Sequence, residues 1–187
     1  MALAAGYEPD EPVIEAIRRR DENALSELMH RHGRWVRGVI FGVLGDVDRV
    51  DDVAQQVWTT VWCRAGELRD GRRWRAWLYR LTHNAALDAG RETGRRRTHA
   101  GALRRVRTGE PGSAPVGQVA GDEQHQYVMS AIQALPPLYR EPFVLRHMQG
   151  WTYRQIAEVM GVRPSSVETR LVRARRLLRE ALKDKMG

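Results

Sequence analysis

Residues 151–182, WTYRQIAEVMGVRPSSVETRLVRARRLLREAL, have the spacing of two short helices joined by a tight turn. The first helix ends at Gly161, because glycine readily takes the left-handed conformation that terminates helices. In the second helix, apolar residues recur at i, i+4, i+7 and i+11, which predicts one buried stripe. Its members are Val167, Leu171, Ala174 and Leu178. The other side is polar and basic, as suits a helix lying in the major groove of DNA.

Charge is distributed unevenly along the 187 residues. The formal net charge is +8. The first 90 residues are nearly neutral, so the excess of arginine lies in the middle and at the C-terminal end. A polyanionic partner is therefore expected for the second half of the chain, and a different partner for the first half. The length suits two small helical domains.

Cys63 is the only cysteine, so an intrachain disulfide is impossible and a reducing compartment is compatible with the sequence. No apolar run approaches the ~20 residues needed to span a bilayer, and the first residues do not resemble a signal peptide. We expect a cytoplasmic protein without direct membrane insertion.

Helical periods recur throughout and strand signals are almost missing, which predicts an all-α fold. Residues 10–91 are expected to form a four-helix bundle. The first helix begins near Pro12. The second begins after the cap Asp21 and ends near Gly42 or Gly45. The third extends over about 49–65 and the fourth over about 74–91. Arginine clusters and a glycine- and proline-rich run predict a flexible basic linker at 92–121. Residues 122–187 form the second domain, which ends in the helix-turn-helix.

The third predicted helix has a polar face opposite its valine stripe. Asp52, Gln55, Gln56 and Thr59 lie at i, i+3, i+4 and i+7. Such a face fits either plain solvent exposure or a binding surface for another protein.

The fourth predicted helix has a face of Arg80, His83, Asn84, Leu87 and Arg91, directed away from Trp74 and Trp77. The tryptophans fit a hydrophobic core. Together with neighbouring arginines, aromatic rings also suit single-stranded nucleic acid, since they stack on bases while cations bind the backbone. The preceding loop, residues 66–73, could present such groups.

These segments together resemble a known family. DDVAQQVW (51–58) and RAWLYRLTHNAALD (75–88) resemble region 2 of the sigma-70 family, and 134–182 resembles region 4. Because both motifs occur in this order, the chain resembles an extracytoplasmic-function (ECF) sigma factor. Members of that group have only these two domains and a linker. The resemblance implies a promoter-specific initiation factor for RNA polymerase.

The resemblance also implies roles for residues. The polar face would bind the coiled coil of the β′ subunit of core RNA polymerase through Asp51, Asp52, Gln55 and Gln56. The loop and fourth helix would open and read the minus-10 element through Arg73, Arg75, Arg80, His83, Asn84 and Arg91, with an extruded base held as in base-flipping proteins. The second helix of the helix-turn-helix would bind the minus-35 element through Ser165, Ser166, Glu168, Thr169, Arg170, Arg173 and Arg176. The linker would pass near the RNA exit path, and an anti-sigma factor is expected as the controlling partner.

Two positions depart from the family pattern. Gln56 stands where glutamate is usual, which removes a charge from the polymerase-binding face. Glu168 stands where relatives often have lysine or arginine. Ser165 and Glu168 fit a capping box, whereas an exposed carboxylate could instead accept a hydrogen bond from cytosine N4.

No motif for catalysis, a cofactor or a metal is recognisable; His30 and His32 lie on different helix faces and make no zinc set with Cys63. We therefore expect no enzyme activity. The competing hypothesis is a homodimeric helix-turn-helix regulator of duplex operator DNA, with the N-terminal bundle used for dimerisation or sensing. The sequence does not define the oligomeric state, the promoter or the inducing signal.

Overall fold

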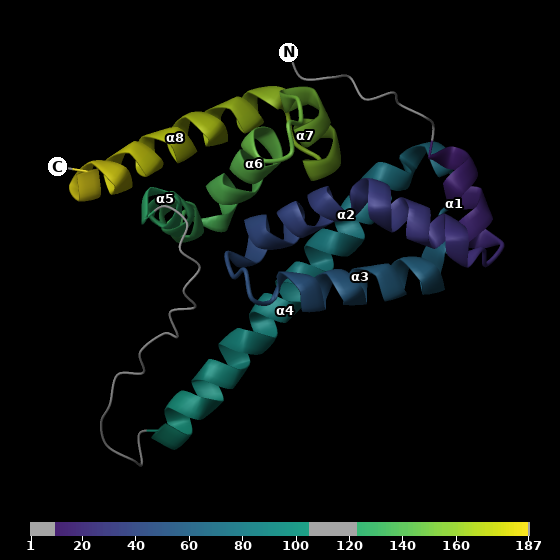
Figure 1. Ribbon diagram of the computed structural model, residues 1–187, viewed down its shortest axis with the longest axis horizontal. Helices are drawn as coiled ribbons and strands as arrows, with labels where there is room; N and C mark the ends of the chain where they lie inside the picture. The colour runs from purple at the N-terminus through teal and green to yellow at the C-terminus, as the bar shows by residue number, and fades with distance from the viewer. Residues whose placement is uncertain (1–9, 105–122, 187) are drawn as a thin grey trace.

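The computed structural model describes residues 10–104 and 123–186, and the side chains of all of these except 93–104, 123–125 and 184–186. Within these ranges the chain is all-α, as predicted, and contains no strand. The helices form an N-terminal group and a C-terminal group that lie against each other (Figure 1). No helix in the described part is both long enough and apolar enough to cross a membrane.

The N-terminal group is a bundle whose first three helices begin and end close to the predicted positions. Its elements are α1 (Glu11–Arg18), α2 (Glu22–Leu44), α3 (Val50–Arg64), the 3-10 turns η1 (Ala65–Glu67) and η2 (Gly71–Arg73), and α4 (Trp74–Arg104). The Asp21 carboxylate caps α2 by accepting from the backbone N–H groups of Asn23 and Ala24. Gly45 ends α2 at φ 69°, in the left-handed region that glycine tolerates.

The residue before α1 does not cap the helix. Asp10 precedes the helix but makes no side-chain capping bond. It is buried instead, with Oδ1 at 3.0 Å from Nε2 of His32 on α2, although the two groups are not aligned for a hydrogen bond. The His32 ring in turn lies 4.6 Å from the ring of Trp74. These residues join α1, α2 and the start of α4.

Helix α4 differs from the prediction in length and in its buried face. It continues to Arg104, 13 residues past the expected end, into the segment predicted as a linker. Residues 105–122, the rest of that segment, lie outside the described residues. Tyr79, Thr82 and Ala86 are buried beside the predicted inner residues. Tyr79 widens the buried face because its hydroxyl contacts Glu141 of the C-terminal group.

The C-terminal group consists of α5 (Glu123–Ala134), α6 (Pro137–His147), α7 (Tyr153–Met160) and α8 (Pro164–Met186). Thr152 and Gln155 form a capping box at the start of α7, and Gly161 ends α7 at φ 65°. The apolar stripe of α8 is buried as predicted. The last two helices therefore form the expected helix-turn-helix.

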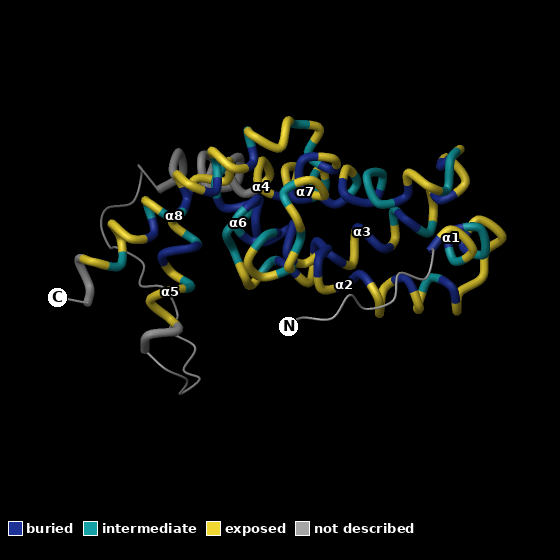
Figure 2. Tube along the Cα trace, turned by 90° about the horizontal axis from the view of Figure 1, so that it is seen from above, coloured by how far each residue is buried: buried dark blue, intermediate teal, exposed yellow. Residues whose placement is uncertain are grey.

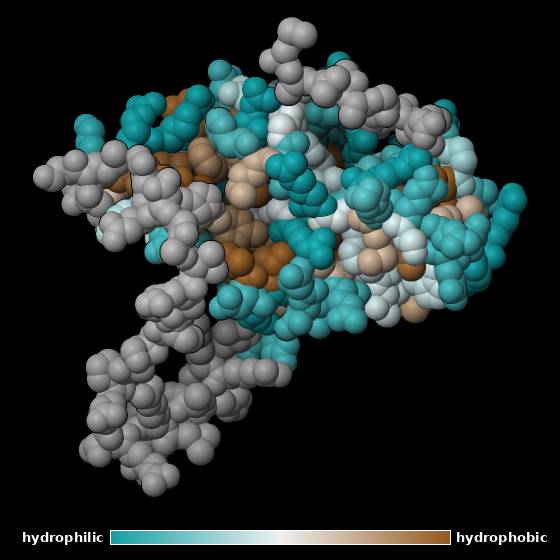
Figure 3. All heavy atoms as spheres, in the orientation of Figure 1, coloured by the Kyte–Doolittle hydropathy of each residue, from teal (hydrophilic) through white to brown (hydrophobic). Residues whose placement is uncertain are grey.

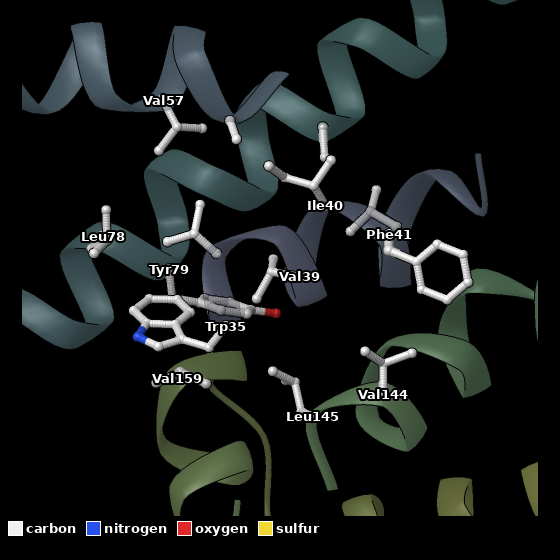
Figure 4. Close-up of a cluster of buried hydrophobic side chains, with 14 of the residues drawn as sticks. Trp35, Val39, Ile40, Phe41, Val57, Leu78, Tyr79, Val144, Leu145 and Val159 are labelled. Atoms are coloured by element: carbon white, nitrogen blue, oxygen red, sulfur yellow. The ribbon is translucent and has the colours of Figure 1, made fainter. Parts of the chain in front are cut away.

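Both helix groups share one hydrophobic core. Trp35 and Val39 of α2 lie close to Leu145 of α6 and Val159 of α7 (Figure 4). The Trp35 ring also lies 5.3 Å from that of Trp151. Figure 2 shows buried stretches in both groups, alternating along the helices with exposed stretches. Hydrophobic side chains gather on the surface where α5 and α6 meet the end of α2 (Figure 3).

Candidate nucleic-acid and polymerase interfaces

The polar face of α3 is open to solvent. Asp51, Asp52, Gln55 and Gln56 are all exposed, while Val53 and Val57 on the other side are buried. Asp51 Oδ1 accepts a hydrogen bond of 2.6 Å from Nε of Arg37 on α2, so its charge is partly neutralised. Asp52, Gln55 and Gln56 keep their side chains available for a partner.

A groove of about 650 Å³ lies on the surface between α3 and α4. Asp52 and Gln56 line it on one side, and Asn84 lines it on the other. The structure therefore places Asn84 beside the proposed polymerase-binding residues, whereas Arg80 and His83 line a different groove. The predicted minus-10 face of α4 is divided between two grooves.

The loop before α4 presents arginines to solvent. The Asp70 carboxylate accepts from the backbone N–H of Arg72, which shapes the turn at η2. Arg73 is exposed, and the guanidinium of Arg75 lies 5.2 Å from the Trp74 ring centroid. Trp74 itself is buried, which fits a core role and leaves its ring unavailable for base stacking. Trp77 is half-buried against the same core.

The other groove, about 540 Å³, lies between α4 and the C-terminal helices. Arg80, His83 and Leu87 line it from α4, Glu141 from α6 and Arg170 from α8. Nε2 of His83 lies 3.6 Å from Oε2 of Glu141. Arg91, the last predicted residue of this face, is exposed and pairs with Asp88 at 3.2 Å.

Tyr79 and Glu141 form a buried polar contact that the sequence did not predict. The Tyr79 hydroxyl donates a 2.7 Å hydrogen bond to Oε1 of Glu141, which is 5% exposed. Burial raises the pKa of the Glu141 carboxyl, against the opposing effects of His83, Tyr79 and Arg170. Burial, together with the Glu141 carboxylate, also raises the pKa of Tyr79. The one hint in the sequence is an acidic residue amid the apolar residues of LYREPFVL.

The minus-35 candidates on α8 mostly face solvent. Ser165, Glu168, Thr169, Arg173 and Arg176 are exposed, and Ser166 and Arg170 are half-buried. Nη1 of Arg173 donates a hydrogen bond of 3.3 Å to the hydroxyl of Tyr139 on α6. This bond orients the Arg173 side chain. Arg176 lies 3.7 Å from Glu180 on the next turn of the helix.

The capping-box interpretation of Glu168 is wrong. Helix α8 begins at Pro164, so Ser165 is already inside the helix and cannot be its N-cap. Glu168 is an exposed residue of the second turn, on the same face as Thr169 and Arg173. The base-reading alternative therefore remains for its carboxylate.

Val172 belongs to the same exposed face of α8 as the minus-35 candidates, but it was not among the residues predicted from the sequence. It is 55% exposed, the largest exposed fraction among the large hydrophobic residues described. It lines a shallow hollow of about 440 Å³ with Glu168, Thr169, Arg173 and Arg176. An apolar group beside polar ones suits a thymine methyl group in the major groove. Its position one turn after Glu168, outside the buried stripe, is the signal that could have identified it.

Comparison with known proteins accords with this geometry. Residues 28–96 match the family model of Sigma-70 region 2, and residues 125–178 match that of Sigma-70, region 4. The chain is 29% identical to RNA polymerase sigma factor CarQ of Myxococcus xanthus over 169 residues, which are 90% of this chain and 95% of that protein. It is 26% identical to the ECF RNA polymerase sigma-E factor of Escherichia coli strain K12, over 89% of this chain and 90% of that protein.

A solved structure is also similar along nearly the whole chain. It is that of CnrH in complex with the cytosolic domain of CnrY. The TM-score is 0.66 at 26% identity, and the match covers 96% of this chain and 100% of CnrH.

Proposed function

The chain belongs to the ECF sigma factors of the sigma-70 family, and we propose that three of its polar surfaces divide the work of promoter-specific transcription initiation. The matched regions are consecutive and cover the helices that present these surfaces. We assign residues 10–91 to region 2, 92–121 to the connection, and 122–187 to region 4. The protein acts in the cytoplasm, where polymerase and DNA are found, and it performs no chemistry itself.

The α3 face is the proposed binding surface for the β′ coiled coil of core polymerase. Asp52, Gln55 and Gln56 are exposed side by side on a rigid helix whose opposite side is fully packed. Two amides and one carboxylate form a surface that gives specificity chiefly by hydrogen bonding, because Asp51 already pairs with Arg37.

The proposed minus-10 surface is the loop of Arg72 and Arg73 together with Arg75, Arg80 and His83. Exposed arginines at this loop suit the backbone of a melted strand. Since Trp74 is buried, bases would be held by polar contacts and by guanidinium planes.

The proposed minus-35 surface is the exposed side of α8. Arg173 and Arg176 suit guanine or phosphate, Glu168 suits cytosine N4, and Val172 suits a thymine methyl group. This combination would give the protein a promoter preference different from that of relatives with a basic residue in place of Glu168.

An anti-sigma factor is the proposed controlling partner. The cytosolic domain of CnrY bound to CnrH is a precedent for a second protein on a chain of this shape. Affinity purification of the full chain from its native cell should recover both core polymerase and such a protein.

The single observation that best supports this function is the pair of region 2 and region 4 matches in one chain whose α3 face and α8 face are both exposed. Run-off transcription with purified core polymerase tests it. We expect discrete promoter-specific transcripts that require this protein. If it yields none and instead shifts palindromic duplex DNA alone as a dimer, the homodimeric regulator is the correct function.

A further inference from the structure

A buried cluster of polar and aromatic side chains lies directly behind the proposed minus-10 surface. It consists of Asp10, which precedes α1, His32 of α2, and Trp74, the first residue of α4. Their exposed fractions are 4%, 9% and 4%. Burying polar groups costs free energy. None of the three proposed binding surfaces includes His32, so its burial needs a role of its own.

His32 contacts both other members of the cluster. Its Nε2 atom lies 3.0 Å from Oδ1 of Asp10, but it has no aligned hydrogen-bond partner. The centroid of its ring lies 4.6 Å from that of Trp74, and the two ring planes are tilted by 46°. Aromatic rings at this separation attract one another beyond the simple burial of area. Because the nitrogen makes no aligned hydrogen bond, we attribute the effect of His32 to its ring.

The surroundings of His32 keep its ring uncharged. Burial lowers the pKa of His32, and the cations Arg75 and Arg31 lower it further, while the Asp10 carboxylate opposes the shift. The guanidinium of Arg75 also lies 5.2 Å from the ring centroid of Trp74. A protonated His32 would bring a second cation to the same ring. The neutral ring is therefore the form that packs against Trp74.

Trp74 joins this cluster to the loop before α4. It directly follows η2, so its position determines where the arginines on either side of it, Arg73 and Arg75, leave the chain. The loop also lies against α1, since a Cβ atom at Gly71 would lie only 3.0 Å from Cγ of Glu11. The loop that carries the proposed minus-10 arginines is thus supported from behind, beside Gly71 and at Trp74.

We propose that His32 is a positioning residue for minus-10 recognition, whose ring holds Trp74, and with it Arg73 and Arg75, in the orientation that binds the melted strand. Groups that bind a ligand must be held rigidly, because a displacement of about 1 Å can cost on the order of 100-fold. The inference rests on the proposed function for its effect on DNA binding. The order of the loop can be measured without that function.

Substitutions at His32 test the effect on DNA. His32→Ala removes the ring, whereas His32→Phe keeps a ring and leaves Asp10 bonded to Nη1 of Arg31 at 3.4 Å. The probe is a single-stranded non-template oligonucleotide with the minus-10 element of a promoter found by run-off transcription. Holoenzyme with His32→Ala should bind it at least about tenfold more weakly, and His32→Phe should restore most of the binding. Binding of a duplex with only the minus-35 element should be unchanged in both variants.

Hydrogen exchange of the free full-length protein measures the loop without DNA or polymerase. The backbone N–H groups of Arg72, Arg73 and Trp74 all donate hydrogen bonds within the loop, to Asp70 or Gly71. They should exchange at least about tenfold faster in His32→Ala than in wild type, and at nearly the wild-type rate in His32→Phe. The amides of α3 should exchange as in wild type, which separates local loosening from unfolding.

Two variants of α2 are controls for the loss of a side chain. His30→Ala removes an exposed histidine, and Ile40→Ala removes a buried side chain further along the helix. Both should leave the loop amides at the wild-type rate. If His32→Ala does not fold, His32→Gln, which lacks a ring but fills part of the space, takes its place.

Unchanged exchange of the loop in His32→Ala would overturn the proposal, and so would faster exchange without weaker minus-10 binding. Equal losses of minus-10 and minus-35 binding would show a general structural role instead. Failure of His32→Phe to restore the loop would show that the ring is not what holds it. If the loop loosens as expected but the wild-type protein directs no initiation, the proposed function fails while the role of His32 in holding the loop stands.

Discussion

Helices α3 and α4 belong to the same bundle, yet their polar faces differ in what lies against them. The α3 face of Asp52, Gln55 and Gln56 meets only solvent and the edge of a groove. The α4 face has Tyr79 buried against Glu141, and His83 lies within 4 Å of the same carboxylate. The folded chain thus exposes its proposed polymerase surface while its C-terminal half covers part of its proposed minus-10 surface. The difference suggests an order of events in which polymerase is bound before DNA.

The largest expected effect is at the uncovered face. Asp52→Arg with Gln55→Arg should weaken core polymerase binding at least about 100-fold, equivalent to ~2.8 kcal/mol, because two cations replace a carboxylate and an amide. A pull-down with core polymerase measures this. Glu27→Arg with Gln126→Arg changes the net charge equally at exposed positions elsewhere and should bind normally. Unchanged binding of the α3 variant would remove this face from the polymerase interface.

The minus-35 face should respond next. Arg173→Ala should weaken binding of holoenzyme to minus-35 DNA by about 1–3 kcal/mol if the side chain contacts a base in bidentate fashion. Titration of a labelled promoter with holoenzyme measures the loss. Arg179→Ala, further along α8 and exposed, serves as the control. Equal affinities for the two variants would show that Arg173 does not face DNA.

A smaller effect is expected where the α4 face is covered. Tyr79→Phe removes the hydroxyl that donates to buried Glu141, which should weaken the contact between the two groups by about 1 kcal/mol. Dyes on the exposed Cys63 and on Arg179→Cys should lie further apart than in the unsubstituted chain, in which the C-terminal helices are closed against α4. Core binding through α3 should stay the same. Tyr153→Phe is the comparison variant, since no hydrogen bond of its hydroxyl is found in the described structure. A Tyr79→Phe distance distribution identical to wild type would mean that the contact does not stabilise closure.

The smallest expected effect is a dependence on pH of the closed arrangement, in which the C-terminal helices lie against α4 at Glu141. Burial raises the pKa of Glu141 in the closed protein, so the closed state binds a proton more readily than the open state. Closure is then most stable below the ordinary glutamate value near 4.5, and it weakens as pH rises through the raised value. His83, Tyr79 and Arg170 face this carboxyl and oppose the shift. Dye distances recorded from pH 5 upward should lengthen in wild type and stay constant in Glu141→Gln.

Features set by local sequence were predicted well. The carboxylate of Asp21 and the glycines Gly45 and Gly161 begin and end their helices as expected, because caps depend on neighbouring residues. The buried stripe of α8 followed directly from its period. Exposure of the α3 face was predictable for the same reason, because its valine stripe fixes which side is buried.

Features set by contacts between distant segments were not predictable. Arg140 and the α2 carbonyls that it binds are nearly 100 residues apart, and neither stretch indicates the other. Periodicity assigned one buried face to α4, whereas the approach of α6 buries Tyr79 on a second side. Glu168 was misjudged because the start of α8 at Pro164 depends on the turn before it. The roles of the site residues in binding stay predictions.

The extension of α4 to Arg104 shortens the connection between the N-terminal and C-terminal halves, and this affects how strong the contact between them must be. The chain between Arg104 and Glu123 can span at most about 68 Å when fully extended, which limits how far the two halves can separate. Because the two halves are joined covalently, each is present near the other at an effective concentration on the order of millimolar. An interface too weak to join two separate proteins at cellular concentrations can therefore keep this chain closed. Cutting the chain in this stretch should release the C-terminal half, although every contact between the halves would still be available.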